Sequence, residues 1–368
     1  MDGLVQLFHA FFPALDSDVL IMNTLLSALF FIIAILSYYV IMATRLIKWL
    51  SNKPKVIKEA INYITSELYN EEISKAARKD YAKKNLTSRF LKDIYVYQCV
   101  ELHKSLSGEL AQDLKQLFAD LNLTEYAMDH FHSYDWATKA NAITVLAEME
   151  YKVAREEIIL FVNHYNITLR YKAQVAAVAL AEKEPFDFLQ YINKPLNEWQ
   201  QLQILNAAMN LKTEQLPLFS NWFQHKEPTV IVLCIKLANH FKQYEASEKI
   251  IEKCADPHYD ISLQAIIAVK QMGIYNAKGL LLDIYSILYT PHQLEVLEFM
   301  PSIGDEDSID FLKNIAHTGD FRHRLLAIQA LLSLIGNKEE LILELKSDDS
   351  ELEEQQLMIN HVLDNSTI

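Results

Sequence analysis

The sequence predicts an all-α protein in which one transmembrane helix precedes an α-solenoid of about seven stacked helix pairs. Three observations support this prediction. The chain of 368 residues has only 7 Gly and 9 Pro, too few for a turn-rich β protein. One uncharged apolar run near the N-terminus is long enough to cross a bilayer. Beyond that run, apolar residues recur with a period of about 31 residues.

The apolar run covers residues 19–43 and contains no charged side chain. At 1.5 Å per residue this length spans a hydrocarbon core of about 30 Å. Polar residues within it are confined to Asn23, Thr24, Ser27 and Ser37, so the helix has no wet face. The run lacks a basic leader and a small-residue cleavage site. We therefore expect it to stay in the mature protein as an anchor in the lipid bilayer.

Charge is distributed unevenly around this span. Residues 1–44 carry three acidic residues and no Lys or Arg, whereas residues 45–92 carry 12 basic and 5 acidic side chains, net +7. The positive-inside rule therefore predicts that residues 1–18 are extracytoplasmic and that the C-terminal side is cytoplasmic. Arg45, Lys48 and Trp49 are predicted to contact the membrane interface. Residues 3–15 are apolar but too short to span, which fits a segment lying along the outer membrane surface.

The rest of the chain is acidic. Residues 93–368 hold 22 basic and 40 acidic side chains, net −18, and bring the formal net charge of the chain to −14. Phosphate binding needs clustered Lys and Arg, so we expect no nucleic-acid partner. Three cysteines, Cys99, Cys234 and Cys254, are an odd number without CxxC spacing. This pattern fits buried thiols in a reducing compartment rather than disulfides or a zinc site.

The repeat occupies residues 135–346. Its seven starting points follow one another at this period, with one step shorter by a single position: Lys139, Arg170, Gln201, Ile231, Ser262, Gln293 and Arg324. Positions at offsets of 3, 6, 7 and 10 from every start are apolar, and these offsets lie on one stripe of an α-helix. A second apolar group, at offsets of 17 to 23 from each start, predicts a second, antiparallel helix. Two short helices cannot bury both faces alone, so neighbouring pairs must stack to form the core.

The segments around the repeat are also predicted to be helical. Residues 44–86 form a basic juxtamembrane stalk, residues 87–134 a helical N-terminal cap, and residues 347–368 an acidic C-terminal cap or tail. Within the stalk and the N-terminal cap, the apolar pattern predicts helices over residues 54–69, 71–84, 87–105, 108–121 and 123–132.

At this point the chain resembles the HEAT-repeat superfamily, particularly the short bacterial repeats of the phycobilisome-lyase type. The resemblance rests on an Arg followed by spaced small residues and a Leu: Arg170, Ala173, Ala176 and Leu180, and Arg324, Ala327, Ala330 and Leu331. It covers roughly residues 135–346, and several units have lost the Arg, so it extends to an architecture rather than to one function. The resemblance implies an armadillo-like solenoid in a bacterial protein. Together with the span, it predicts a single-pass protein of the inner (cytoplasmic) membrane with a cytoplasmic repeat domain.

In HEAT-like repeats the helix with the Arg and Ala signature lines the concave side, so its solvent face is the predicted binding surface. Offsets of 2, 5 and 9 lie opposite the apolar stripe. They define a polar ribbon that we predict to bind a protein partner: Lys172, Gln203, Asn206, Asn210, Lys236, His240, Gln264, Gln271, Glu295, Glu298 and Gln329. An ordinary solvated face is the alternative interpretation, because any exposed helix face is polar.

Motifs of common catalytic sites are missing from the sequence. It contains no GxGxxG, GxxxxGK[ST], HExxH or GxSxG, which argues against phosphate cradles and hydrolase elbows. Two groups resemble metal ligands, but their irregular spacing favours solvated turns: His130, His132 and Asp135, and His317, Asp320 and His323. We therefore expect no catalytic residue, no metal and no cofactor.

The function predicted from the sequence is that of a membrane-anchored scaffold or adaptor that binds protein partners at the membrane and catalyses no reaction. An accessory subunit of an envelope polysaccharide or transport system is one alternative. A bilin lyase-like enzyme is the other, because lyase-type relatives of these repeats attach or remove a bilin pigment.

Overall fold

The computed structural model of the protein describes residues 17–69 and 74–336 together with residues 345, 357, 360 and 361. The side chains of residues 17–21 and 45–50 lie outside this description, as do nearly all of the predicted segments 1–18 and 347–368. Every described element is a helix, so the predicted all-α solenoid class is confirmed. The chain divides into two compact units, residues 1–126 (unit 1) and 127–368 (unit 2).

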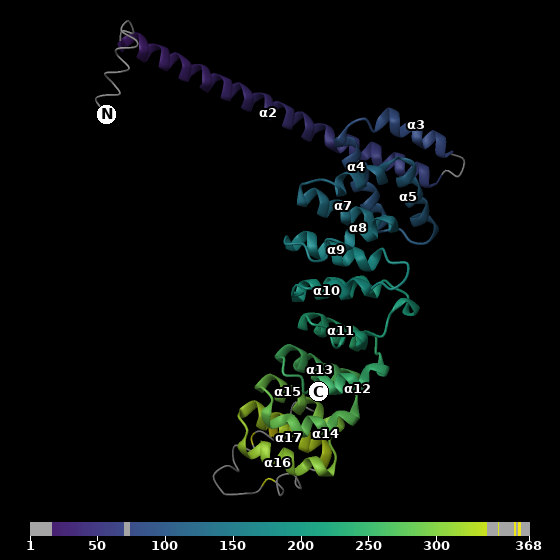
Figure 1. The fold of residues 1–368 in the computed structure, drawn as a ribbon, viewed down its shortest axis with the longest axis vertical. Coiled ribbons are helices and arrows are strands. Elements are labelled where there is room, and N and C mark those ends of the chain that lie inside the picture. The colour runs from purple at the N-terminus through teal and green to yellow at the C-terminus, as the bar shows by residue number, and fades with distance from the viewer. Residues whose placement is uncertain (1–16, 70–73, 337–344, 346–356, 358–359, 362–368) are drawn as a thin grey trace. The chain divides into compact units, whose positions relative to one another are not determined.

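The longest element of unit 1 is α2, a continuous helix of 52 residues (Ser17–Leu68). It contains one stretch, Met22–Thr44, that is long and apolar enough to cross a membrane, and this stretch is fully exposed. The sequence predicts separate helices over residues 19–43 and 54–69, but α2 joins them and runs through Pro54 (Figure 1). Pro54 is exposed and lacks the N–H that would otherwise donate to the helix turn before it.

Three helices complete the body of unit 1: α3 (Lys75–Asn85), α4 (Arg89–His103) and α5 (Glu109–Asp120). The division between the units falls within α6 (Leu123–Phe131). The ends of these helices lie within four residues of the predicted ones. Serine side chains cap α3 and α4: Ser74 accepts a hydrogen bond from the backbone N–H of Ala77, and Ser88 from that of Leu91.

The first helix of every repeat in unit 2 begins three residues before the predicted starting point. These helices are α7 (Trp136–Glu148), α9 (Ile167–Ala179), α10 (Glu198–Met209), α11 (Pro228–His240), α13 (Tyr259–Met272), α15 (Thr290–Ile303) and α17 (Phe321–Ile335). Helices α9, α10 and α11 lie one above another in Figure 1. The structure therefore reproduces the period of the sequence, including its one shorter step.

Caps and core residues explain these positions. Side chains directly before five of the seven helices accept a hydrogen bond from a backbone N–H of the first turn: Asp135, Asn166, Asn197, Glu227 and Asp320. Such a cap satisfies a donor that has no partner within the helix. The predicted apolar stripe lies mostly in the core, where Ala173, Leu237 and Leu331 are completely buried.

The second elements of the first six repeats are short, and those that are α-helices have five to ten residues. The second element is an α-helix in four repeats: α8 (Arg155–Ile159), α12 (Ser247–Lys253), α14 (Lys278–Ile284) and α16 (Ile309–Thr318). In the second and third repeats it consists of 3-10 turns, chiefly η2 (Asp187–Tyr191) and η4 (Phe219–Trp222). Pro185, Pro195 and Pro217 lie in these two segments, and each removes a backbone donor and disfavours the α conformation of the preceding residue. The seventh counterpart falls in residues 337–344, outside the described residues.

Candidate functional site

The eleven residues of the predicted polar ribbon lie on the first helices α9 to α17, or at the end of one of them. None of them is buried. Six are exposed and five are half-buried, so all have atoms that a partner could reach. That they bind a partner stays a prediction.

Part of the ribbon joins neighbouring repeats. The Lys172 Nζ donates a hydrogen bond to Asn141 Oδ1 at 3.2 Å, and the Lys236 Nζ donates to Gln201 Oε1 at 2.9 Å. Burial lowers the pKa of both lysines. Sequence spacing could not distinguish these bridging side chains, because the contact depends on the distance between two stacked helices.

The same kind of bridge recurs toward the C-terminus. The Asn239 side-chain amide donates to Gln271, and the Lys270 Nζ lies 2.7 Å from Glu298 and 2.5 Å from Glu295. Burial opposes the charge of Lys270, but its hydrogen bonds to the two glutamates raise its pKa. Five ribbon residues therefore hold the stack together: Lys172, Lys236, Gln271, Glu295 and Glu298. Among the described residues, five ribbon side chains make no hydrogen bond or ion pair: Gln203, Asn206, His240, Gln264 and Gln329.

A second surface was missed by sequence reasoning. One large apolar side chain stands at the beginning of six of the seven first helices, between 38% and 62% exposed: Trp136, Ile167, Trp199, Tyr259, Tyr289 and Phe321. We call this set the edge row. Its members Tyr259 and Tyr289 contact each other, with ring centroids 5.2 Å apart. Isolated exposed apolar residues are normal on soluble proteins, but a set that recurs with the structural period is not scattered.

The edge row is interrupted at α11, where a hollow of about 700 Å³ opens beside the 3-10 turns of the second and third repeats. Tyr191, Trp222, His225 and the α11 N-cap Glu227 are among its lining residues. The signal for the row was present in the sequence as large apolar residues two to four positions before the repeat starts. The hollow had no such signal, because it depends on the second element not forming an α-helix there.

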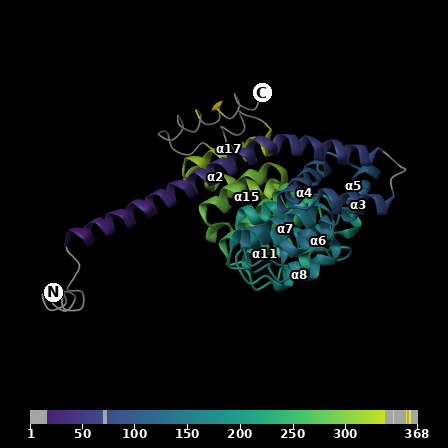
Figure 2. The same cartoon turned by 90° about the horizontal axis from the view of Figure 1, so that it is seen from above.

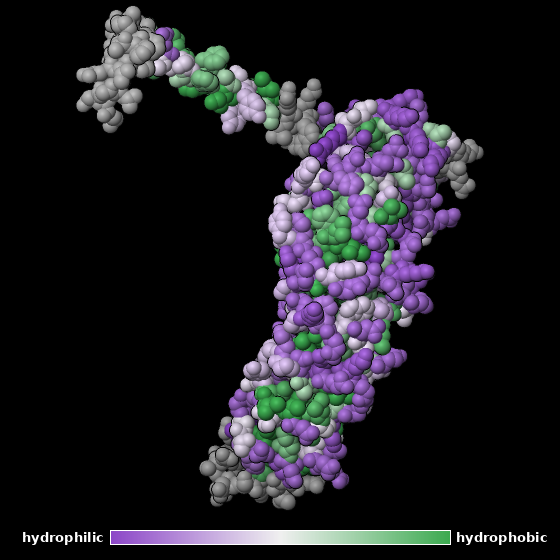
Figure 3. Space-filling model, in the orientation of Figure 1, coloured by the Kyte–Doolittle hydropathy of each residue, from purple (hydrophilic) through white to green (hydrophobic). Residues whose placement is uncertain are grey.

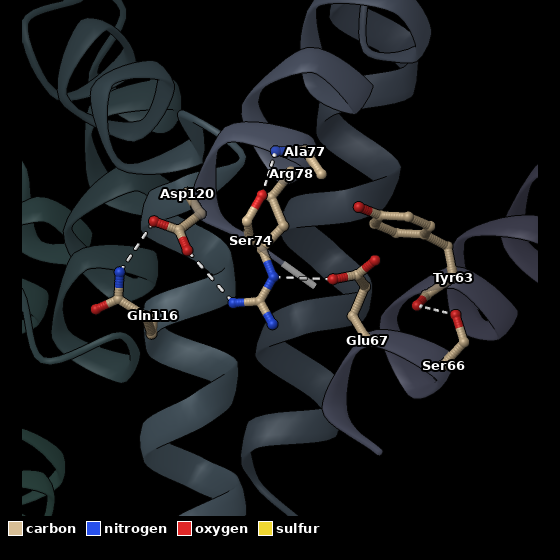
Figure 4. Close-up of polar contacts among 8 residues, drawn as sticks. All are labelled: Tyr63, Ser66, Glu67, Ser74, Ala77, Arg78, Gln116 and Asp120. Atoms are coloured by element: carbon tan, nitrogen blue, oxygen red, sulfur yellow. Dashed lines mark hydrogen bonds and ion pairs between the residues drawn. The ribbon is translucent and has the colours of Figure 1, made fainter. Parts of the chain in front are cut away.

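Unit 1 contains a cluster of buried charges around Arg78 of α3 (Figure 4). The Arg78 Nε donates to Glu67 Oε2 of α2 at 2.8 Å, and its Nη1 donates to Asp120 Oδ2 of α5 at 3.3 Å. Glu67 is 5% exposed and Asp120 is 2% exposed. Gln116 donates a further hydrogen bond to Asp120 at 2.9 Å. Burial opposes the charge of Arg78, but the hydrogen bonds to both carboxylates outweigh burial and raise its pKa.

Three tyrosines, one each from α2, α3 and α4, extend this cluster. The ring of Tyr63 stacks on that of Tyr81 at 3.6 Å, and the hydroxyls of Tyr81 and Tyr95 are 2.7 Å apart. Burial and the neighbouring Glu67 carboxylate raise the pKa of Tyr63. The ion pair and the stacked rings together clamp α3 onto the last turns of α2. We call this group the clamp.

The remaining sequence predictions concern the membrane interface and metals. Helix α2 includes Arg45, Lys48 and Trp49, but their side chains lie outside the description, so their contact with the membrane interface stays a prediction. Asp320 caps α17 and contacts His323 Nδ1 at 2.6 Å, and Asp135 caps α7. No group of three or more His, Cys, Asp or Glu side chains in the described ranges is arranged to hold a metal ion.

The fold and its surfaces define an α-helical repeat protein with one helix able to span a membrane. No protein-family model matches the chain, and no curated protein matches it. Among solved structures it is similar to the complex of CpcE and CpcF of phycocyanin lyase from Nostoc sp. PCC7120. That match covers 80% of this chain and 96% of the other, with 12% sequence identity and a TM-score of 0.26. At this identity and TM-score the likeness supports no inference about function.

Proposed function

We propose that this protein is a membrane-anchored scaffold whose HEAT-like solenoid binds protein partners on the cytoplasmic side of a bacterial inner membrane. The anchor is α2, whose stretch Met22–Thr44 has the length and apolarity of a membrane span. The orientation follows from the 12 basic residues among residues 45–92 and the absence of Lys and Arg from residues 1–44.

The observation that supports partner binding most strongly is the edge row. Trp and Tyr are enriched among the residues that contribute most to protein interfaces, because they bury a large rigid area and lose little side-chain entropy. Helices stack about 8–10 Å apart, so one large apolar side chain per repeat gives a partner a regular series of anchor points. The hollow beside Trp222 and the unpaired ribbon residues add hydrogen-bonding groups, since Asn193 and His225 are among the residues that line the hollow.

The proposal is tested by chemical crosslinking in intact membranes followed by mass spectrometry of proteins purified with the tagged full-length chain. One variant truncates the edge row (Trp136→Ala, Trp199→Ala, Phe321→Ala). A second removes unpaired ribbon side chains (Asn206→Ala, His240→Ala, Gln264→Ala), which avoids the residues that bridge repeats. Specific partners recovered with the wild type are expected to be lost with the edge-row variant and reduced with the ribbon variant.

The matched control truncates Val153, Tyr244 and Tyr275 to Ala. These side chains are between 58% and 75% exposed, comparable with the edge row, but lie at the beginning of second elements. The control is expected to retain every partner. Recovery of the same partners with the wild type and the edge-row variant would contradict binding through this edge.

The absence of catalysis belongs to the same proposal. The purified full-length chain is expected neither to attach a bilin pigment to an acceptor protein nor to remove one. Turnover in such an assay, read from the covalent pigment absorbance of the acceptor, would favour the lyase alternative instead.

A further inference from the structure

The exposed charges of unit 1 are mostly positive on the side nearest the span. Six basic residues, Lys53, Lys55 and Lys58 of α2, Lys83 and Lys84 of α3, and Arg89 of α4, form a set that we call the basic collar. Five of them are exposed and Lys53 is half-buried. Figure 3 shows a mainly hydrophilic surface on this unit, in contrast to the apolar stretch of α2.

The clamp places the α3 members of the collar. Tyr63 of α2 stacks on Tyr81 of α3, and Glu67, one turn further along α2, pairs with Arg78 of α3. A later residue of α2 therefore contacts an earlier residue of α3. The two helices are therefore antiparallel, and Figures 1 and 2 both show α3 turning back along α2. Lys83 and Lys84 follow Tyr81, so they lie level with the α2 residues just before Tyr63. The C-terminal end of α3 thus points back toward the span.

The distance from the span to the collar follows from helix geometry. Lys53 and Lys55 come nine and eleven residues after Thr44, which is about 14–17 Å along a helix axis. Lys83 and Lys84 lie about 25 Å beyond Thr44 by the same measure. The headgroup layer extends roughly 5–8 Å beyond the hydrocarbon core, and the Debye length at physiological salt is about 8 Å. Along the helix axis, Lys53 and Lys55 therefore lie about 6–12 Å beyond the headgroups, which is about one Debye length, and Lys83 and Lys84 lie about two Debye lengths beyond them.

Three acidic neighbours lower the formal charge of the collar from +6 to +3 but leave it positive. Lys55 lies 3.9 Å from Glu59, Lys84 lies 2.7 Å from Asp80, and Arg89 lies 4.0 Å from Asp93. All three are exposed pairs between residues four apart on one helix, and such pairs are weak enough for the basic side chain to exchange its carboxylate for another anion. In contrast, the carboxylates that could neutralise α3 more strongly, Glu67 and Asp120, are already bound to Arg78.

From these observations we infer that the basic collar binds the anionic headgroups of the lipid leaflet into which α2 inserts. The clamp holds α3 in the orientation that presents Lys83 and Lys84 to that surface. The inference rests on the proposed membrane anchorage, and it adds a second, electrostatic attachment that draws unit 1 toward the bilayer. Clusters of four to eight basic residues directly beside a span bind anionic lipid in this way, and each side chain near the surface strengthens the attraction by a factor of about five. The factor is smaller for Lys83 and Lys84, because the surface potential falls off within a Debye length.

The test places a fluorescent donor on unit 1 of the full-length chain and an acceptor lipid in the vesicle surface. Thr87→Cys provides the labelling position, because Thr87 is exposed between α3 and α4 while the three native cysteines are buried. Energy transfer is compared in vesicles of phosphatidylcholine alone and with phosphatidylglycerol added. Transfer is expected to rise with phosphatidylglycerol and to return to the lower value in about 1 M salt, where the Debye length is about 3 Å.

Two charge variants separate the collar from net charge. Lys55→Gln, Lys58→Gln, Lys83→Gln and Lys84→Gln together are expected to abolish the rise. The control variant, Lys183→Gln, Lys212→Gln, Lys226→Gln and Lys249→Gln, loses the same charge from exposed positions of unit 2 and is expected to keep it. A rise that survives the collar substitutions, or no rise in the wild type, would overturn the inference. Collar-dependent binding of a short DNA duplex in phosphatidylcholine vesicles would overturn it in favour of nucleic acid.

Failure of the anchorage itself gives a different result. Alkaline carbonate would then release the full-length chain from every vesicle, and transfer would be absent in both lipid mixtures. If the chain stays bound in carbonate but energy transfer does not change with phosphatidylglycerol, the result supports the anchor and contradicts only the collar proposal.

Discussion

The two units of this protein achieve cohesion by different means. In unit 1 a single guanidinium, that of Arg78, pairs with two carboxylates that are almost completely buried. In unit 2 the buried guanidinium of Arg155 pairs with only one carboxylate, that of the partly exposed Asp187, and donates to the Ala177 carbonyl. The rest of the cohesion that the described residues show comes from an apolar stripe and from polar bridges that recur between neighbouring helices. The comparison predicts that one substitution at Arg78 destabilises unit 1 strongly. In unit 2 the stabilising contacts are spread over many repeats that contact only their neighbours, so the loss of one polar bridge should cost little.

The native cysteines allow each unit to be followed separately in the full-length chain. Cys99 is buried in unit 1, and Cys234 and Cys254 are buried in unit 2. Burial raises the pKa of the Cys99 and Cys254 thiols to about 12, and also raises that of Cys234, so none should react in the native state near pH 8. Labelling of each thiol in increasing urea, measured by mass spectrometry of its peptide, then reports the unfolding of its own unit.

The largest effect is expected from Arg78→Met. It leaves the buried Glu67 and Asp120 without their guanidinium partner, which costs about 3–5 kcal/mol. The value should lie toward the lower end, because Gln116 and Lys75 still contact Asp120. The urea midpoint for Cys99 should fall accordingly, while those for Cys234 and Cys254 stay unchanged.

Two controls sharpen this prediction. Arg78→Met combined with Glu67→Gln and Asp120→Asn removes all three charges and is expected to recover most of the loss. Lys270→Met in unit 2 should cost at most about 1 kcal/mol, because its glutamate partners are 26% and 43% exposed. Equal losses from Arg78→Met and Lys270→Met would show that the proposed contrast between the units is wrong.

A somewhat smaller effect is expected from Leu237→Ala in α11. Leu237 is completely buried in the stripe, and truncation of such a leucine costs about 2–5 kcal/mol. The midpoints for Cys234 and Cys254 should fall and that for Cys99 should not. Leu202→Ala, at a 46% exposed position of α10, is the matched control and should change neither. A shift of all three midpoints by Leu237→Ala would mean that the units unfold together.

Much of unit 2 could be predicted from the sequence because its signal is repeated. The apolar offsets located seven first helices, and each begins three residues before the predicted start, at Trp136 as at Phe321. The prediction of α-helical second elements in the second and third repeats was wrong. Pro185 and Pro217 prevent an α-helix there, although the apolar residues still reach the core.

The surfaces were harder to predict than the core. Half-buried Lys172 and Lys236 satisfy the same polar pattern as unpaired Gln203, and only the stacking distance reveals which of them bridges two repeats. The clamp was missed for a related reason. Glu67, Arg78 and Asp120 come from three separate helices, and no local spacing connects them.

A smaller effect is expected at the helix caps of unit 2. Asn166 accepts hydrogen bonds from the N–H groups of Thr168 and Leu169, and Asn166→Ala should cost about 0.5–2 kcal/mol. The decrease is read from the Cys234 and Cys254 midpoints. His258→Ala precedes α13 without a side-chain cap bond and should have a smaller effect. Equal effects of the two substitutions would show that capping does not determine where these helices begin.

The smallest expected effect is the loss of unit 2 stability in acid. Hydrogen bonds from Thr138 lower the pKa of Asp135, and contacts with His323 lower the pKa of Asp320. A lowered pKa in the folded state adds stability above the unfolded pKa of about 3.9, and this stability is lost as pH falls through the folded value. The urea midpoint should therefore change little between pH 8 and pH 5 and fall below about pH 4, measured by circular dichroism because thiols do not react in acid. Asp135→Asn should reduce this acid sensitivity, and an unchanged profile would remove the caps as its cause.

The most direct test of the continuous stack is crosslinking between repeats with a short bismaleimide in the full-length chain. Cysteine pairs at Asn141 and Lys172, and at Lys270 and Glu298, replace side chains that touch across adjacent repeats. A pair at Asn141 and Gln203 spans two repeats. The stack predicts efficient crosslinks for both adjacent pairs and none for the distant pair. Failure of the adjacent pairs, or a crosslink of the distant pair as efficient as theirs, would contradict it.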